Sequence, residues 1–257
     1  MNTCIYNDPV ALGKAAGQSA AQLIREAITL KGTANIIFAT GTSQFETIKE
    51  LIAAKDIDWS KVVMFHLDEY ISLPLTHPAS FRKYLQERFL SQVPKLKNAW
   101  LINGETDAVR ECKCLGDLIL KHPIDVALIG IGENGHLAFN DPPADFTTEK
   151  PYIIVQLNQA CKKQQVDEGW FKSVDEVPQT AVSMSIRQIL QSKHIICSVP
   201  GARKAMAVKN TLEKEISELY PSAILREHKN CTLYLDQDSA GSLNAAIKGK
   251  ITCITTG

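Results

Sequence analysis

Short apolar stretches of strand length alternate along the chain with longer stretches in which apolar residues recur every three or four positions. Such alternation is typical of strands connected by helices. The expected strands cover residues 35–39, 61–67, 99–102, 124–131, 152–157, 194–199 and 231–235, with a further apolar segment at 251–254. The expected helices cover residues 9–30, 44–54, 81–90, 107–121, 162–171 and 202–213.

This order of elements predicts an α/β fold. Strands joined through helices form right-handed crossovers, which produce a doubly wound, mostly parallel sheet between two layers of helices. We therefore expect a Rossmann-like, three-layer architecture. No repeat, linker or low-complexity tract interrupts the pattern. Residues 1–257 are expected to form a single domain with a small lid-like segment at about 158–185.

The strand expected at 124–131 leads into a glycine-rich turn that carries Asn134, His136 and Asp141. An unbroken apolar run is typical of a buried parallel strand, and open α/β sheets bind small molecules at the carboxyl ends of such strands. A histidine near a carboxylate at this place predicts acid/base chemistry. The alternative is a structural histidine. A metal site would need more His or Cys ligands nearby, so no metal is expected.

The turn between the first expected strand and its helix contains Gly41, Thr42 and Ser43. Free N–H groups and hydroxyls at the start of a helix can hold a phosphate without a charged side chain. The turn lacks the Gly-Lys-Ser/Thr ending of a nucleotide-binding P-loop. An ordinary helix cap by Thr42 or Ser43 is the alternative.

The second expected strand ends at two adjacent carboxylates, Asp68 and Glu69. A partly desolvated carboxylate at this position is a candidate base, because loss of solvent raises its pKa. Carboxylates also cap turns. We expect one of the two to cap the following turn and the other to be free for chemistry.

Basic residues that are candidates for binding an anion occur in two places. Lys162 and Lys163 lie on the lid-like segment, and Arg203 and Lys204 follow a strand-to-helix turn. A lysine in the first turn of a helix opposes the helix dipole, so Lys204 is best explained by an anion bound there. For Lys163 an ordinary solvated surface position is the stronger interpretation.

Composition excludes several classes of protein. Lysine plus arginine and aspartate plus glutamate both number 28, so the net charge of zero gives no electrostatic case for binding nucleic acid or an anionic membrane. No apolar run is long enough to span a bilayer, and the N-terminus has no basic segment followed by an apolar one. We expect a cytoplasmic protein whose seven cysteines are reduced thiols.

Taken together, the motifs resemble the glucosamine-6-phosphate deaminase/isomerase family over essentially the whole chain. They are Thr40–Ser43, Leu67–Tyr70 with Leu73–Pro74 and His77–Pro78, and Gly130–Pro142, which reads GIGENGHLAFNDP. The resemblance implies a Rossmann-like sheet and no metal or organic cofactor. It also implies conversion of glucosamine 6-phosphate and water to fructose 6-phosphate and ammonia.

The resemblance assigns roles to individual residues. Asp68 matches the base that moves the C2 proton, and His136 matches the residue that opens the pyranose ring. Asp141 falls at the carboxylate that supports the histidine, and Asn134 falls at a position from which it can orient the ring. The positions at or beside the phosphate are Gly41, Thr42, Ser43, Lys162 and Lys204.

Three positions depart from the family pattern. The family often has Asp in place of Asn134, commonly has Glu in place of Asp141, and has an arginine on the lid-like segment where this chain has Lys162. These differences bear on rate and exact substrate more than on fold. Because the chain ends soon after Ile254 without a long helical tail, we expect a monomer or small homo-oligomer rather than a hexamer.

Two alternatives to a deaminase remain open. A 6-phosphogluconolactonase shares the fold and the Gly-His loop, but it needs no C2 base and usually resembles Asp-Glu-Arg where this chain has Asp68-Glu69-Tyr70. A non-catalytic sugar-phosphate sensor is the other, although no helix-turn-helix segment is present. A preference for galactosamine 6-phosphate as substrate is also open.

Overall fold

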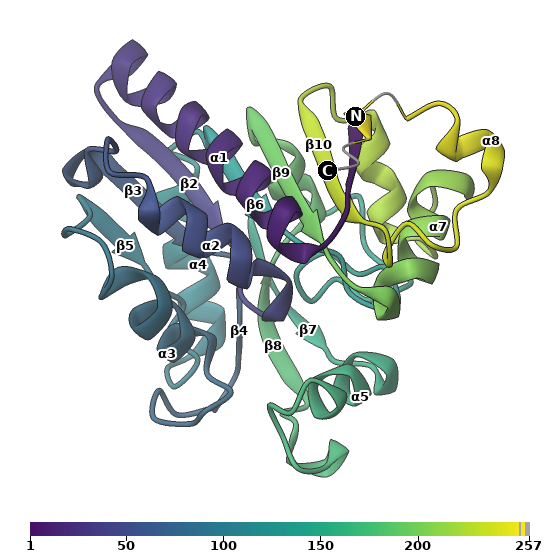
Figure 1. Ribbon diagram of the computed structural model, residues 1–257. Coiled ribbons are helices and arrows are strands. Elements are labelled where there is room, and N and C mark those ends of the chain that lie inside the picture. The colour runs from purple at the N-terminus through teal and green to yellow at the C-terminus, as the bar shows by residue number, and fades with distance from the viewer. Residues whose placement is uncertain (252, 255–257) are drawn as a thin grey trace.

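The computed structural model describes residues 1–251, 253 and 254 and is built around a parallel sheet of eight strands (Figure 1). The bounds of these strands are Asn2–Tyr6 (β1), Ala34–Phe38 (β2), Val62–His66 (β3), Asn98–Trp100 (β5), Val126–Ile129 (β6), His194–Val199 (β9), Cys231–Asp236 (β10) and Cys253–Ile254 (β11). Their order is β11-β1-β10-β9-β6-β2-β3-β5, and neighbouring strands are parallel.

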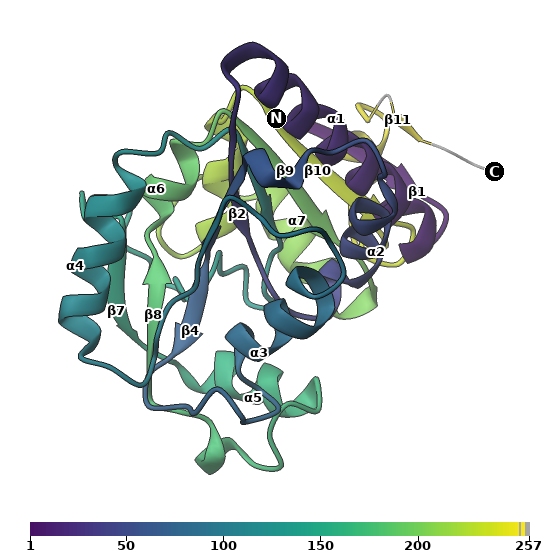
Figure 2. The ribbon, with the colours of Figure 1, turned by 90° about the vertical axis from the view of Figure 1, so that its left-hand side faces the viewer.

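Helices cover both faces of this sheet (Figures 1 and 2). One face carries α1 (Pro9–Lys31) and α2 (Phe45–Ala53), and the other carries α4 (Ala108–Ile119) and α7 (Ala205–Glu213). Side chains alternate along β2, so that Ile36 packs in the apolar cluster with α1 while Ile37 packs in the cluster with α4. The predicted doubly wound, three-layer α/β fold is therefore confirmed.

A second, antiparallel sheet of three strands lies below the parallel sheet in Figure 1. It consists of β4 (Asp68–Tyr70), β8 (Thr180–Met184) and β7 (Tyr152–Gln156), in the order β4-β8-β7. Only Leu67 separates β3 from β4, so the chain passes from the large sheet to the small one at this residue. The excursion between β7 and β8 carries α5 (Gln159–Asp167) and the short helix η4 (Val174–Glu176).

The small sheet differs from the sequence prediction. The strand expected at 152–157 forms, but it pairs with β8 in the small sheet rather than joining the parallel one. Its partner lies inside the segment expected to be a lid, and pairing between distant strands leaves no local pattern. Among the strands and α-helices of the described residues, five were not predicted: β1, β4, β8, α6 (Ile186–Leu190) and α8 (Ala245–Lys248).

Helix ends follow their capping residues. Asp8 accepts a hydrogen bond from the Ala11 N–H and Pro9 is the first helical residue, so α1 begins where expected. The helix expected at 162–171 begins three residues earlier, because the Asn158 side chain caps it by accepting from the Cys161 N–H. In the apolar segment 251–254, β11 forms, whereas residue 252 lies outside the described residues.

The length and apolarity of the helices also bear on membranes. Across residues 1–251, 253 and 254, no helix is both long enough and apolar enough to cross a bilayer.

Candidate active site

A pocket of about 70 Å³ lies between α5 and the carboxyl ends of β2, β3, β6 and β9. This is the edge of a parallel sheet at which small molecules bind in open α/β folds. Six of the residues singled out from the sequence line it: Gly41, Thr42, Ser43, Asp68, His136 and Lys204. The structure thus brings the candidate base, the histidine and the anion-binding turn into one pocket.

The turn after β2 is held against the neighbouring strand. Gly41 has a positive φ of 96°, which favours glycine, and the short helix η1 (Thr42–Gln44) begins immediately after it and continues into α2. The Gln44 side chain donates to the Ile129 carbonyl of β6 at 3.1 Å. The first N–H groups of a helix have no partner within that helix, so this turn presents donors to an anion.

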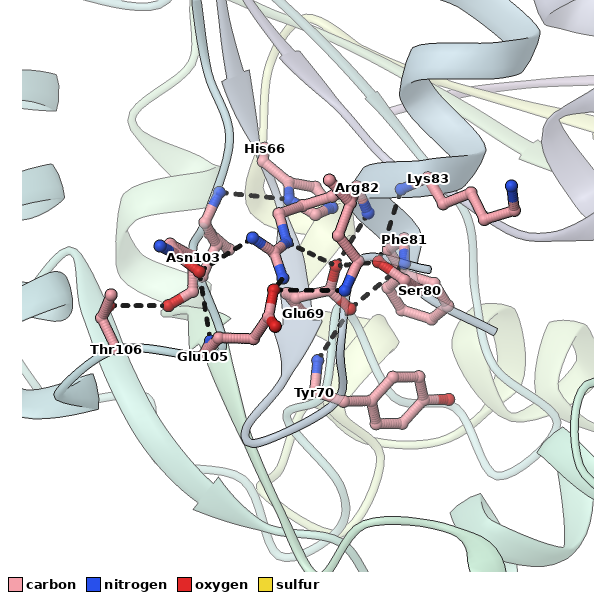
Figure 3. A network of polar contacts seen from close by, with 12 residues as sticks. His66, Glu69, Tyr70, Ser80, Phe81, Arg82, Lys83, Asn103, Glu105 and Thr106 are labelled. Carbon is pink, nitrogen blue, oxygen red and sulfur yellow. Dashed lines mark hydrogen bonds and ion pairs between the residues drawn. The ribbon is translucent and has the colours of Figure 1, made fainter. Parts of the chain in front are cut away.

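Asp68 and Glu69 have different contacts. Glu69 accepts hydrogen bonds from the Phe81 N–H at 3.1 Å and the Arg82 N–H at 2.7 Å (Figure 3). These are the first residues of α3 (Phe81–Leu85), whose N-cap residue is Ser80, so Glu69 binds free N–H groups at the start of this helix rather than capping the turn directly after the strand, as the sequence had predicted. Asp68 faces the pocket instead.

Burial changes the acidity of Asp68. Its side chain is enclosed, and loss of solvent followed by the negative charge of Glu69 raises the pKa of Asp68 to about 8. A carboxylate with such a pKa holds a proton more tightly than an exposed one and is a stronger base near neutral pH.

A polar network extends from Glu69 through Arg82 to Asn103 and Glu105 (Figure 3). Arg82 Nε lies 3.6 Å from Glu69 Oε2, while the guanidinium donates to Asn103 Oδ1 at 2.8 Å and to Glu105 Oε2 at 2.6 Å. Burial, and then the charge of Arg82, lower the pKa of the neighbouring His66 to about 3. His66 is therefore neutral, and the charges of Arg82 are balanced by carboxylates.

His136 is positioned by the glycine turn after β6. A Cβ atom on Gly132 would lie 2.2 Å from the imidazole ring, so only glycine permits the ring to pack against this backbone. The ring Nδ1 lies 3.2 Å from Asp141 Oδ1, and the Asn134 side chain donates to the same carboxylate oxygen at 2.9 Å. With Nδ1 donating to Asp141, Nε2 is the ring atom left for the pocket.

Asp141 is held as an anion. Burial alone would raise its pKa, but the hydrogen bond and charge of His136, the Asn134 amide and the Asn158 N–H outweigh burial and lower the pKa of Asp141. Asp141 and Asn134 therefore contact the histidine rather than the pocket.

Cys161 lies close to this pair. One ligand atom each from His136, Asp141 and Cys161 lie within 4.8 Å of one another, a donor set that zinc accepts. The Asp141 carboxylate has three hydrogen-bond partners, His136, Asn134 and the Asn158 N–H, which suit a support for the histidine, and we assign the pair that role.

The two candidate lysines lie in different surroundings. Lys204 follows β9 on the short helix η5 (Ala202–Lys204) and lines the pocket. Burial lowers its pKa, although the carboxylates of Glu168 and Glu133 oppose that effect. Lys162 is buried outside the pocket, where its Nζ donates to Gln179 Oε1, so the structure does not bring it to the other phosphate-site candidates.

The lid-like segment instead contributes Gln164, Gln165, Glu168 and Trp170 to the pocket. None of these was singled out from the sequence. The signal was a polar face on α5, since residues 164, 165 and 168 share one side of a helix. Nothing local showed that this polar face is turned inward.

The raised pKa of Asp68 has a consequence for stability. The folded state binds a proton at Asp68 that the unfolded state has lost above pH 4, so stability falls as pH rises from about 4 to about 8. His66 acts oppositely, because its lowered pKa removes stability as pH falls below 6.5. Between pH 6.5 and 8, we expect Asp68 to destabilise the wild type by at most about 1.4 kcal/mol per pH unit.

Urea denaturation of the wild type and an Asp68→Asn variant at several pH values measures this effect. The variant should have a flatter pH dependence than the wild type between pH 6.5 and 8 and should be more stable at pH 8. Parallel pH dependences in the two proteins would contradict the raised pKa.

Comparison with known protein families and sequences identifies relatives over most of the chain. The profile of the family described as "Glucosamine-6-phosphate isomerases/6-phosphogluconolactonase" matches residues 7–234. A protein of Oenococcus oeni named glucosamine-6-phosphate deaminase is 34% identical over 230 residues, which are 89% of this chain and 94% of that protein. One of Bacillus cereus with the same name is 32% identical over 248 residues, covering 96% and 91%.

Solved structures show the same fold. A monomeric glucosamine-6-phosphate deaminase is similar with a TM-score of 0.87 and 30% identity, covering 94% of this chain and 100% of that one. A 6-phosphogluconolactonase of Shewanella baltica has a TM-score of 0.75 at 20% identity, covering 92% and 97%. At that identity the second likeness concerns the fold alone.

Proposed function

Since the chain belongs to the family of glucosamine-6-phosphate isomerases and 6-phosphogluconolactonases, we propose that it is an enzyme of amino-sugar catabolism that converts glucosamine 6-phosphate and water to fructose 6-phosphate and ammonia. One observation carries this proposal: Asp68 and His136 line a single pocket together with the turn 41–43 and Lys204. A base, an acid/base histidine and an anion site within one pocket are what this reaction requires.

In the proposed mechanism the phosphate anchors the sugar between the turn 41–43 and Lys204. His136 moves a proton between the ring oxygen and the C1 hydroxyl to open the pyranose, and Asp141 stabilises its charged form. Asp68 then takes the proton from C2 while O1 gains a proton, which gives an enolamine. Asp68 returns the proton to C1 and the nitrogen loses one proton, so the 2-amino aldose becomes a 2-imino compound with a hydroxyl at C1. Water replaces nitrogen at C2, and ammonia leaves.

The pKa values of the two carboxylates support these separate roles. Burial raises the pKa of Asp68 to about 8, which suits a base that takes a proton from carbon, whereas Asp141 is held ionised beside His136. A lactonase needs no C2 base, so a basic Asp68 favours the deaminase over that alternative.

Ammonia release in a coupled assay tests the proposal. We expect turnover of glucosamine 6-phosphate, with galactosamine 6-phosphate in a parallel reaction to measure epimer preference. Hydrolysis of 6-phosphogluconolactone without ammonia release from either hexosamine would replace the deaminase by the lactonase. Tight sugar-phosphate binding without turnover would indicate a sensor.

We further propose that the enzyme acts in the cytoplasm as a monomer or small homo-oligomer, with no metal or organic cofactor. The likeness to a structure described as a monomeric deaminase supports the smaller assembly. Light scattering of the purified protein measures its mass in solution, and a hexamer would contradict this proposal.

A further inference from the structure

A carboxylate lies beside the candidate phosphate-binding lysine inside the pocket. Glu168 Oε1 is 3.8 Å from Lys204 Nζ, and the two side chains are only 5% and 7% exposed. Two donors from the same segment hold Glu168 in place: Gln164 Nε2 at 2.8 Å from Oε1 and Trp170 Nε1 at 3.2 Å from Oε2. The position of Glu168 is therefore fixed by three neighbouring groups.

This arrangement conflicts with a bound phosphate. A phosphate that contacts Lys204 and the turn 41–43 would lie next to Glu168. Two neighbouring anions in a poorly solvated pocket repel each other strongly. The volume of about 70 Å³ is also far below the roughly 300 Å³ at which ligand pockets usually begin. With Glu168 in this position, the pocket repels the phosphate group and is too small for a hexosamine phosphate.

We propose that Glu168 is an internal counter-ion of Lys204 that the phosphate of the substrate displaces. In the empty enzyme Glu168 neutralises the buried ammonium and keeps the lid-like segment over the pocket. The phosphate of the substrate forms an ion pair with Lys204 in place of Glu168. Glu168 then moves away, and the lid-like segment opens far enough to admit the sugar. This inference rests on the proposed function, because it assumes a phosphate-bearing substrate at this site.

The contacts of α5 indicate how such a movement is transmitted. The Gln164 side chain connects the glycine turn with Glu168. Its Oε1 accepts from the Glu133 N–H of that turn at 2.9 Å, and its Nε2 donates to Glu168. Loss of the Glu168 contact therefore weakens the connection between α5 and the glycine turn. A second connection, from the Tyr70 hydroxyl to Gln165 Oε1 at 2.7 Å, does not involve Glu168 and can retain α5 during the movement.

The proposal is tested by the affinity for inorganic phosphate, which contains no sugar and undergoes no reaction. A Glu168→Gln variant removes the competing charge but keeps the size of the side chain. We expect calorimetric titration to show phosphate binding about tenfold tighter than in the wild type. A merely structural role for Glu168 predicts the opposite, because the variant would lose a pocket contact.

Asp167→Asn is the matched control, since it removes one negative charge from the adjacent, exposed position, where Asp167 pairs with Lys163. Its phosphate affinity should equal that of the wild type. In a Lys204→Met background the gain from Glu168→Gln should be smaller, because no ammonium remains to compete for and only the direct repulsion between Glu168 and phosphate is removed.

The outcomes separate this inference from the proposed function. Unchanged or weaker phosphate binding in Glu168→Gln, with measurable binding in the wild type, would overturn the counter-ion role alone. If neither the wild type nor the variant bound phosphate or glucosamine 6-phosphate, the phosphate site would be wrong, and the inference with it.

Tryptophan fluorescence can detect the displacement of Glu168 in the wild type, without a Glu168 variant. Trp170 donates to Glu168, so phosphate should change the emission of the wild type and leave that of a Trp170→Phe variant unchanged. Phosphate binding by the wild type without that change would contradict the displacement.

Discussion

An Asp68→Asn variant should lose about a thousandfold in the rate of ammonia release from glucosamine 6-phosphate. The amide has the shape of the carboxylate but cannot accept the C2 proton. Among the described residues the two nearest alternatives do not replace it: Glu69 is bound to the first turn of α3, and Glu168 pairs with Lys204 in the empty pocket and, in our proposal, moves away when phosphate binds. Exchange of the C2 proton with solvent deuterium, followed by NMR, measures the step itself.

The wild type should gain activity with pH as Asp68 ionises, so kcat/KM should rise until about pH 8. Asp117→Asn is a matched control, because Asp117 is 59% exposed on α4 and pairs with Lys113, and neither residue lines the candidate active site. Its activity should equal that of the wild type. Normal turnover and C2 exchange in Asp68→Asn would remove Asp68 from the mechanism.

A Gly132→Ala variant should lose most of its activity, by about a hundredfold, while retaining the fold. The added methyl group would lie 2.2 Å from the His136 ring, which must leave its place against the turn and weaken its hydrogen bond to Asp141. Steady-state kinetics measure the loss of activity, and far-ultraviolet circular dichroism verifies the fold.

Gly116→Ala is the control for this substitution. A Cβ at Gly116, within α4, meets its nearest neighbour Pro151 at 3.5 Å, an ordinary contact, so we expect unchanged activity and slightly higher stability. Full activity in Gly132→Ala would show that the position of the imidazole is not needed for turnover.

Much of the fold could be predicted because the responsible signals are local. Asp8 followed by Pro9 predicts the start of α1, and the apolar run after Ile124 predicts β6. The glycines behind that run, with His136 and Asp141 at fixed spacing, also predicted a histidine next to a carboxylate, and the structure has these two side chains 3.2 Å apart.

The remainder depends on contacts between distant segments. β4 is recognisable only through its pairing with β8, more than a hundred residues later. The same holds for α5: the sequence shows Lys162 and Glu168 as two polar residues on one helix. Which of them faces the pocket depends on how Cys161 and Phe171 of this segment pack in one apolar cluster with Tyr70 and Phe139. Lys162 was therefore favoured for its charge, and Glu168 was overlooked.

The path of the chain through the small sheet has an evolutionary implication. Both ends of the α5 excursion are anchored in adjacent antiparallel strands, β7 and β8, which belong to a different sheet from the strands that deliver Gly41, His136 and Lys204. The excursion still contacts the proton-transfer residues at its two ends, because β8 pairs with the strand that carries Asp68 and the Asn158 N–H donates to Asp141. Insertions, deletions or exchanges confined to the part between these contacts leave Asp68 and His136 in place, so descendants of such a protein can acquire new substrate preferences by remodelling one interchangeable module.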